Sequence, residues 1–173
     1  KAFIDQDITK KECYGLPVLN TLPADQEKLI ISIGNNAIRK KIAQEVKNEI
    51  GILIHPKSIS SDSVTIEEGT VVMGGVVINA ETTIGKHCII NTNASVDHDC
   101  LIEDFVHISP NAALAGGVEV GEGTQIGIGA SVIQGIKIGK WCVVGAGAVI
   151  INNIPDYSVV VGNPGKIIKK NII

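Results

Sequence analysis

The sequence contains few aromatic residues: phenylalanine, tyrosine and tryptophan together make up 3% of its 173 residues, and methionine occurs once. This scarcity fits a narrow core filled by isoleucine, valine and alanine. An excess of positive charge is also lacking, because the net charge is −3, which argues against a nucleic-acid partner. No apolar run approaches the roughly twenty residues that cross a bilayer, so we expect no membrane partner.

Paired cysteines are missing as well. The four cysteines show no C-x-x-C spacing, which argues against a zinc or redox motif. Cys88, Cys100 and Cys142 fall in a repeating column of small residues, so we expect buried side chains with free thiols. Free thiols favour a cytoplasmic location.

A repeat of six residues dominates the rest of the chain. Every sixth residue from Ile54 to Ile150 is aliphatic, with Ser60 as the one exception, and small or β-branched residues follow four places later. A period of six fits neither a helix nor simple strand alternation and is typical of a β-solenoid. At about 3.3 Å per residue, a hexad makes one short strand and a corner, so three hexads close a triangular coil. Glycine one place after the aliphatic residue, as at Gly85 and Gly121, predicts an unusual backbone angle there.

Residues 1–51 lack this repeat and predict part of an α/β domain. A buried strand is expected over residues 28–33, followed by a helix through Lys47 that Asn35 or Asn36 caps. Apolar residues from Ile38 to Val46 should form the buried face of that helix, and residues 52–54 the next strand.

The repeat divides the chain into three parts. Residues 1–51 form the α/β part, residues 52–151 the solenoid, and residues 152–173 a tail expected to cover the last coil. Since the chain begins with Lys1 and not methionine, we expect that a preceding segment is absent from it.

His98 is the first candidate for chemistry. It lies between Asp97 and Asp99 on an outward position of a hexad. An imidazole beside a carboxylate suits a general base, because the acid orients the ring and raises its basicity. From spacing alone, a solvated surface histidine is an equal alternative.

Two further residues are related to His98 by the coil length. His107 is nine residues away, which is half a coil, so the two histidines should lie on opposite sides of one prism. They could share a site only if another subunit brought its own copy. Gly116 is eighteen residues after His98, on the next coil, where a missing side chain would leave room for a thin cofactor arm.

The hexads and several motifs resemble the sialic acid O-acetyltransferase-like family of left-handed β-helix acyltransferases. That family includes bacterial N-acetyltransferases of nucleotide-linked 4-amino sugars of the bacillosamine and perosamine type. The matching stretches are residues 3–5, 33–42, 53–56, 90–92, 96–100, 106–108, 144–148 and 161–164. The run Asp97-His98-Asp99-Cys100 within the hexads is the most specific of them. The resemblance implies a left-handed parallel β-helix preceded by a partial, Rossmann-like α/β domain.

The resemblance also implies an activity. We expect a homotrimer that transfers acetyl from acetyl-CoA to the 4-amino group of a UDP- or GDP-linked 4-amino-4,6-dideoxy sugar in bacterial glycan biosynthesis. His98 would be the general base with Asp99 as its acidic neighbour, and the amine would attack the thioester directly. The implied cofactor contacts are His107, Gly116, Ile128 and Ala146, and the implied nucleotide-sugar contacts are Asp5, Gln6 and Gly34. Gln6 departs from the family, which usually has a second acid there. The family's Gly-rich phosphate loop would precede Lys1.

Other functions compete with this one. A sugar O-acetyltransferase of the sialic acid type would use the same base and groove, and a non-catalytic solenoid for binding or assembly would share the fold. A γ-class carbonic anhydrase also uses this fold, but it needs three histidines at a zinc, two of them five residues apart. His55, His87, His98 and His107 lack that spacing, so no metal is expected.

Overall fold

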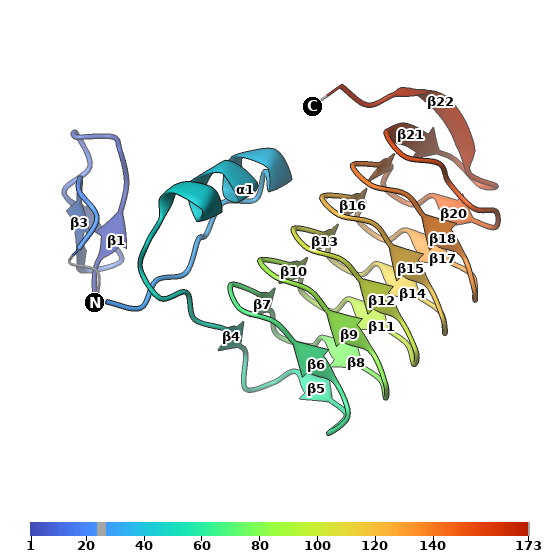
Figure 1. Cartoon of the computed structure of the whole chain (residues 1–173), viewed down its shortest axis with the longest axis horizontal. Helices are drawn as coiled ribbons and strands as arrows, with labels where there is room; N and C mark the ends of the chain where they lie inside the picture. Colours follow the sequence, from blue (N-terminus) through green and yellow to red (C-terminus); the bar gives the residue numbers. More distant parts are fainter. Residues whose placement is uncertain (24–26, 173) are drawn as a thin grey trace.

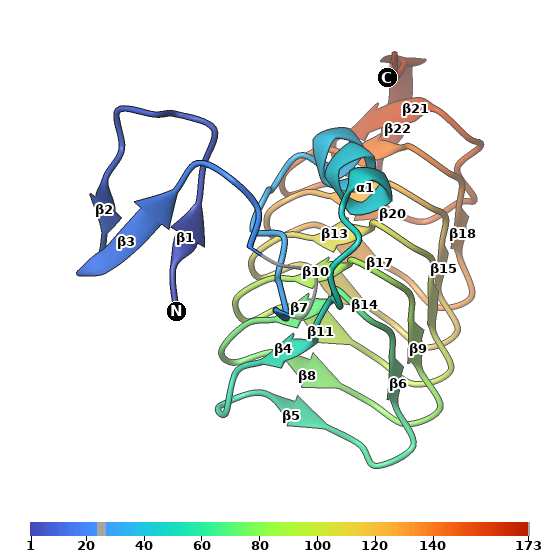
Figure 2. The same cartoon turned by 60° about the vertical axis from the view of Figure 1, so that its left-hand side comes forward.

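Each hexad folds into a two-residue strand followed by a turn, and the strands stack into three parallel sheets (Figure 1). The sheets are the faces of a triangular prism, seen from another side in Figure 2. This computed structural model describes residues 1–23 and 27–172. The left-handed parallel β-helix that the family resemblance implies is confirmed.

The three faces follow one another around each coil. The first face contains β4 (Leu53–Ile54), β7 (Val71–Val72), β10 (Ile89–Ile90), β13 (His107–Ile108), β16 (Gln125–Ile126) and β19 (Val143–Val144). The second contains β5 (Ile59–Ser60), β8 (Val77–Ile78), β11 (Ser95–Val96), β14 (Ala113–Leu114), β17 (Ser131–Val132) and β20 (Val149–Ile150). The third contains β6 (Thr65–Ile66), β9 (Thr83–Ile84), β12 (Leu101–Ile102), β15 (Glu119–Val120) and β18 (Lys137–Ile138). The turns after these strands are called the first, second and third corner.

The register is one coil of eighteen residues from β4 to β20, and only the last coil, where Val143 pairs with Val159, is shorter. His107 pairs with Ile89 and with Gln125, so equivalent positions lie directly above one another. The second residue of each strand points inward, and Ile90 and Ile108 are fully buried. The first coil differs, because no described segment lies beneath it and Ile54 remains 49% exposed.

The corners correct one prediction about glycine. The left-handed backbone angle occurs at the third place after the inward residue, as at Asn93 (φ 56°) and Asp99 (φ 58°). Gly85 and Gly121, one place after it, do not adopt a positive φ. A Cβ at Gly121 would lie 2.7 Å from the backbone of Gly139 on the next coil. Glycine is therefore needed there because neighbouring coils approach closely.

Threonine and cysteine form three hydrogen-bonded pairs inside the corners. Each threonine hydroxyl accepts a bond from the backbone N–H of the cysteine one coil further on and donates to a turn carbonyl. The pairs are Thr70–Cys88, Thr82–Cys100 and Thr124–Cys142. All three cysteines are buried with free thiols, which confirms the predicted small core side chains.

The N-terminal part begins with a small mixed sheet that stands beside the prism (Figures 1 and 2). In it, β1 (Phe3–Ile4) pairs in parallel with β3 (Leu16–Leu19), and β2 (Glu12–Cys13) pairs with β3 in antiparallel. The strand predicted over residues 28–33 does not form, since only an isolated bridge between Leu29 and Ile50 is present. Residues 53–54 belong to the prism as β4, because Ile54 is in register with Val72.

Helix α1 (Asn36–Glu45) follows this sheet and is capped by Asn35, whose side chain accepts from the Ile38 N–H at 2.9 Å. Its apolar face is only partly covered: Ile38 is 52% exposed, and Ile42, Ala43 and Val46 are half-buried. The fully buried residues are instead Asn36 and Arg39. The helix lies on the third corner, where turn carbonyls need hydrogen-bond donors, so polar side chains face the prism.

The C-terminal end closes the first face. β21 (Ser158–Val161) pairs in parallel with β19, and β22 (Lys166–Lys170) pairs with β21 in antiparallel. The turn between them lies against the end of the second face, where the Gly165 N–H donates to the Val149 carbonyl at 2.8 Å.

Candidate active site

The turn at residues 97–99 lies at the second corner, after β11, and presents His98 to solvent. The His98 Nδ1 and the Asp99 Oδ2 are 2.7 Å apart, and 59% of the His98 side chain is exposed. The left-handed backbone of Asp99 belongs to the turn that brings the two neighbouring side chains together. A carboxylate at Nδ1 leaves Nε2 free to accept a proton, which is the arrangement that a general base requires.

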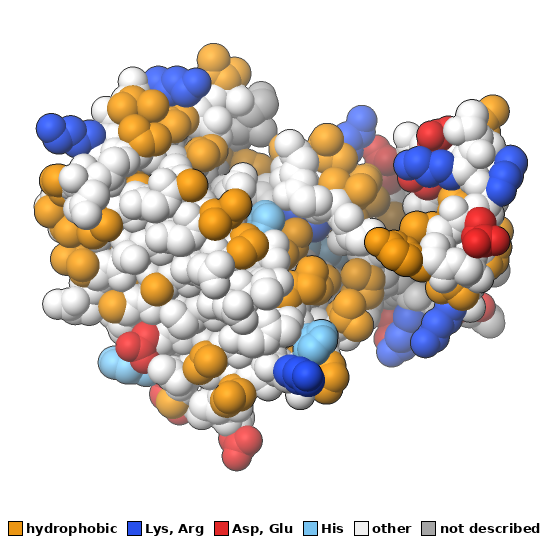
Figure 3. Space-filling view, turned by 180° about the vertical axis from the view of Figure 1, so that it is seen from behind, with side chains coloured by type: hydrophobic (Ala, Val, Ile, Leu, Met, Phe, Trp, Pro, Cys, Tyr) orange, Lys and Arg blue, Asp and Glu red, His pale blue; other side chains and the backbone are white. Residues whose placement is uncertain are grey.

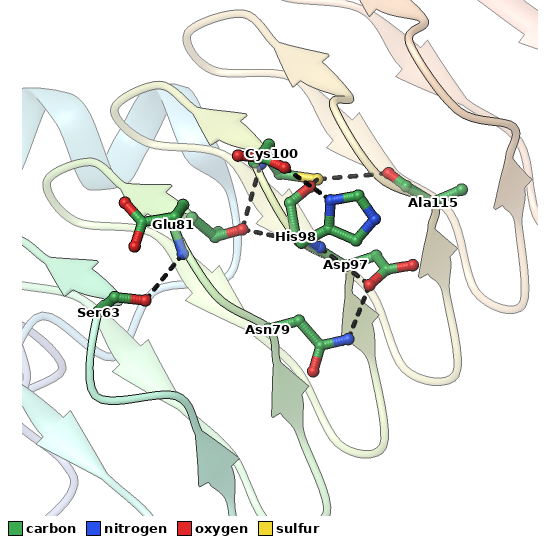
Figure 4. Close-up of polar contacts among 9 residues, drawn as sticks. Ser63, Asn79, Glu81, Asp97, His98, Cys100 and Ala115 are labelled. Carbon is green, nitrogen blue, oxygen red and sulfur yellow. Dashed lines mark hydrogen bonds and ion pairs between the residues drawn. The ribbon is translucent and has the colours of Figure 1, made fainter.

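Asp97 holds the turn and does not contact the ring nitrogens. Its Oδ1 accepts from the His98 backbone N–H at 2.9 Å and from the Asn79 amide at 2.7 Å. Figure 4 shows Asn79 reaching Asp97 from the preceding coil. The Asn79 hydrogen bond, followed by that of the His98 backbone, lowers the pKa of Asp97. Asn79 was not among the predicted residues, because its role depends on the stacking of coils.

Both carboxylates strengthen His98 as a base. The hydrogen bond that His98 donates to Asp99, and after it the charge of Asp97, raises the pKa of His98. The neighbouring Cys100 thiol is different, since burial raises its pKa and keeps it protonated. Of these two side chains, the His98 imidazole is the exposed one that stays available as a candidate base, and the thiol is a core side chain.

Gly116 has a role that its sequence position did not reveal. A Cβ at this position would lie 2.6 Å from His98 Cε1 and 2.7 Å from Nε2. The imidazole of His98 therefore occupies the space that was expected to hold a cofactor arm. Gly116 leaves room for this ring, and its contact with the cofactor remains a prediction.

His107 begins β13 on the first face and is half-buried. The Asn91 amide lies 3.0 Å from its Nε2, and the Asn91 Oδ1 accepts from the Thr92 N–H at 2.8 Å. That second bond orients the amide so that its NH₂ donates to Nε2, which makes His107 a neutral imidazole with its proton on Nδ1. Burial, and after it the charge of Arg39, lowers the pKa of His107. Asn91 was not predicted as a site residue, although it lies in one of the matching stretches.

The remaining cofactor candidates lie at the first corner. Ile128 and Ala146 occupy equivalent positions on consecutive coils, and Ile128 is 58% exposed. A Cβ at either of the adjoining Gly129 and Gly147 would meet nothing within 4 Å, so this corner is narrow and open. Within this one chain no described contact joins His98 to His107, Ile128 or Ala146.

The nucleotide-sugar candidates lie in the N-terminal part. Asp5 follows β1, and its carboxylate contacts Lys10 at 2.6 Å, while Gln6 is exposed beside it. Lys10 lowers the pKa of Asp5 through this hydrogen bond. Gly34 lies before α1, away from these two residues and next to the prism, where its carbonyl accepts from Arg39.

Two open grooves lie on the prism. One of about 340 Å³ runs along the second face beside Asp97 and is floored by small residues such as Ser95, Ala113 and Ser131. The other, of about 450 Å³, lies on the third face and contains none of the predicted site residues. The groove beside Asp97 is thus the one adjacent to the candidate base. Viewed from behind, the prism surface carries few charged side chains (Figure 3).

The described part of the chain contains no group of three or more potential metal ligands. Over the same residues, no helix combines the length and apolar character needed to span a bilayer.

Comparison with known proteins places this geometry in context. The bacterial transferase hexapeptide (six repeats) family matches residues 117–152. UDP-N-acetylbacillosamine N-acetyltransferase of Bacillus subtilis is 49% identical over 47 residues, which are 25% of this chain and 22% of that protein. Serine acetyltransferase of Buchnera aphidicola is 31% identical over 134 residues, 75% of this chain and 44% of that protein. The chain thus spans less than half the length of these curated relatives.

Solved structures match nearly the whole chain. A histidine variant of perosamine N-acetyltransferase from Caulobacter crescentus, in complex with CoA and GDP-perosamine, has a TM-score of 0.91 and 38% identity. The match covers 98% of this chain and 85% of that one. The acetyltransferase domain of PglB from Neisseria gonorrhoeae, in complex with acetyl coenzyme A, has a TM-score of 0.91 and 40% identity. It covers 96% of this chain and 85% of that one.

Proposed function

The chain belongs to the hexapeptide-repeat family of left-handed β-helix acyltransferases, and on that premise we propose that it transfers acetyl groups from acetyl-CoA to an amine. The acceptor is the 4-amino group of a UDP- or GDP-linked 4-amino-4,6-dideoxy sugar. The single observation that carries the proposal is the 2.7 Å contact between His98 Nδ1 and Asp99 Oδ2 on an exposed turn. The relatives that bind CoA and a nucleotide amino sugar support the substrate class.

The proposed reaction uses His98 as the general base. Acetyl-CoA supplies an activated thioester carbonyl. His98 Nε2 removes a proton from the acceptor nitrogen as that nitrogen attacks the carbonyl carbon, and Asp99 stabilises the resulting imidazolium through Nδ1. The new C–N bond forms, the C–S bond of the thioester breaks, and the departing CoA thiolate takes up the proton from the imidazolium. No acyl-enzyme is required, because the buried Cys100 thiol, with its raised pKa, is not a nucleophile.

The first corner fits a thin cofactor arm. Ile128 and Ala146 flank turn glycines with open space around them, so an extended chain could lie along these two coils against backbone groups. Those residues, together with His107 and Gly116, are the proposed cofactor contacts. Asp5, Gln6 and Gly34 are the proposed contacts to the nucleotide sugar.

A trimer would complete this site. His98 and Gly116 lie at the second corner, whereas the other proposed cofactor residues, His107, Ile128 and Ala146, lie on the first face and first corner, so two prisms must contribute. The small outward residues of the second face suit close packing of a second copy. Sedimentation should therefore give a mass near three times 18.2 kDa. An active monomer would contradict a site shared between subunits.

The function is tested by thiol release from acetyl-CoA with a panel of nucleotide-linked 4-amino and hydroxy sugars. We expect release with the amino sugars and a loss of about 10²–10⁴-fold in His98→Ala. His55→Ala is the matched control, because His55 is another exposed corner histidine. Release with hydroxy sugars alone would replace the proposal by an O-acetyltransferase. Equal activity of His98→Ala and the parent would remove the proposed base.

A further inference from the structure

Arg39 on α1 is buried to 1% exposure and uses all five of its N–H donors. Nε donates to the His87 carbonyl at 2.8 Å, and Nη2 donates to the Phe105 carbonyl at 2.9 Å and to Asn36 Oδ1 at 2.8 Å. Nη1 donates to the carbonyls of Ile33 and Gly34, at 2.9 Å and 3.3 Å. One guanidinium therefore joins the segment before α1 to two consecutive turns of the third corner.

This guanidinium has no carboxylate partner within the described chain. Burial lowers the pKa of Arg39 to about 10, so it is still charged at neutral pH. A buried cation is costly unless it is fully hydrogen-bonded, and here only neutral oxygens satisfy it. Removing any one of those carbonyls would leave a donor unpaired, so the five contacts are mutually dependent.

Attachment of the helix alone does not require Arg39. The next residue, Lys40, pairs with Glu122, and its Nζ lies 5.8 Å from the ring centroid of Phe105 and 5.4 Å from that of Trp141. Asn36 also donates to the Gly123 carbonyl at 3.0 Å. These contacts hold α1 on the third corner through residues other than Arg39. Arg39 is distinguished from Lys40 by its hold on Ile33 and Gly34.

His107 lies where these contacts converge. It lies two residues after Phe105, whose carbonyl accepts from Arg39 at 2.9 Å. No hydrogen bond reaches His107 Nδ1 from the described residues. Burial, and after it the positive charge of Arg39, lowers the pKa of His107, and the Asn91 amide lies at its Nε2.

We propose that Arg39 is a positioning residue of the acetyl-transfer site, which holds the Gly34 segment on the Phe105 turn, two residues before His107. The inference rests on the proposed function, in which Gly34 faces the nucleotide sugar and His107 the acetyl-CoA thioester. Arg39 thereby makes the two substrate-binding regions one rigid unit, because a single side chain binds the carbonyls on both sides.

The test separates the charge of Arg39 from its geometry in the full chain. Arg39→Ala removes both, whereas Arg39→Lys keeps the charge but offers three donors in place of five. Lys40→Ala is the matched control, since it weakens attachment of the same helix without touching Gly34. The readouts are NMR titration of His107, assigned with His107→Gln, amide exchange of residues 33–36, and calorimetric binding of acetyl-CoA.

In Arg39→Ala we expect a higher His107 pKa, faster exchange at residues 33–36 and acetyl-CoA binding weakened by about tenfold. Arg39→Lys should keep the His107 pKa near the parent value and still show the faster exchange. Added guanidinium should restore Arg39→Ala in part. Unchanged amide exchange at residues 33–36 in Arg39→Ala, or the same changes in Lys40→Ala, would overturn the proposal. If Arg39→Ala does not fold, the exchange pattern of Arg39→Lys decides.

Failure of the proposed function would look different. A parent chain that does not bind acetyl-CoA would refute that function, whereas the His107 titration and the exchange measurements need no ligand. They therefore test the positioning role of Arg39 separately.

Discussion

Gly116→Ala should lower turnover while leaving the fold intact. The added Cβ would lie 2.6 Å from His98 Cε1, well inside van der Waals contact. Restoring an ordinary separation requires the imidazole to retreat by about 1 Å, and a misplacement of that size costs on the order of 10²-fold in rate. The stability change should stay within about 1 kcal/mol, because φ of Gly116 is not positive and the ring is free to move into solvent.

The assay compares kcat, the dissociation constant of acetyl-CoA and the thermal midpoint of Gly116→Ala with those of Gly51→Ala. Gly51 is the matched control, because its Cβ would meet Ile30 at 3.8 Å, an ordinary contact, and its φ is not positive. We expect kcat to fall in Gly116→Ala alone. Weakened acetyl-CoA binding with an unchanged kcat would refute the reasoning and would restore Gly116 as part of a cofactor groove.

The remaining predictions concern the protonation of three side chains. Asp99→Asn should lower turnover less than His98→Ala and move the acidic limb of the pH–rate curve to lower pH, because Asp99 raises the pKa of His98; a shift to higher pH would contradict this assignment. Cys100→Ala should keep near-parent turnover, and its complete loss would require a covalent route through the thiol. His87 is buried and stacked on Phe105, and burial lowers its pKa. The unfolded chain therefore binds a proton first as pH falls below about 6.5, so stability should decrease from there down to the folded pKa. Urea unfolding at pH 7 and pH 5 should show a smaller decrease for His87→Phe, and an equal decrease would rule out His87 as the cause.

The prism and the His98 turn could both be predicted because their determinants are local. A hexad carries its own inward residue, small residue and turn, so reading the period is enough to assign the faces. His98 and Asp99 are adjacent, and the left-handed turn that joins their side chains recurs at other corners. The 2.7 Å contact between His98 Nδ1 and Asp99 Oδ2 therefore follows from two adjacent residues and from their position within the hexad.

The docking of α1 could not be predicted in this way. Apolar spacing from Ile38 to Val46 suggested a helix with an apolar buried face, yet Arg39 is the residue that the prism buries. Its partners His87 and Phe105 are 48 and 66 residues away and contribute backbone carbonyls, which carry no sequence signal. Asn91 and Asn79 were missed for a related reason, since each acts on a residue of the next coil.

The sequence by itself determined the repeat period, the inward column of the prism and the phase that presents His98 at a corner, because each depends on residues a few places apart. Tertiary structure alone decided that Gly116 leaves room for the His98 imidazole and that Asn91 hydrogen-bonds to His107. It also decided that Arg39 ties the Gly34 segment to the third corner. These outcomes depend on which atoms meet when coils stack and a helix packs across them. The groups involved are backbone carbonyls, which every residue carries, and glycines, which also occur in ordinary turns, so the sequence does not mark them.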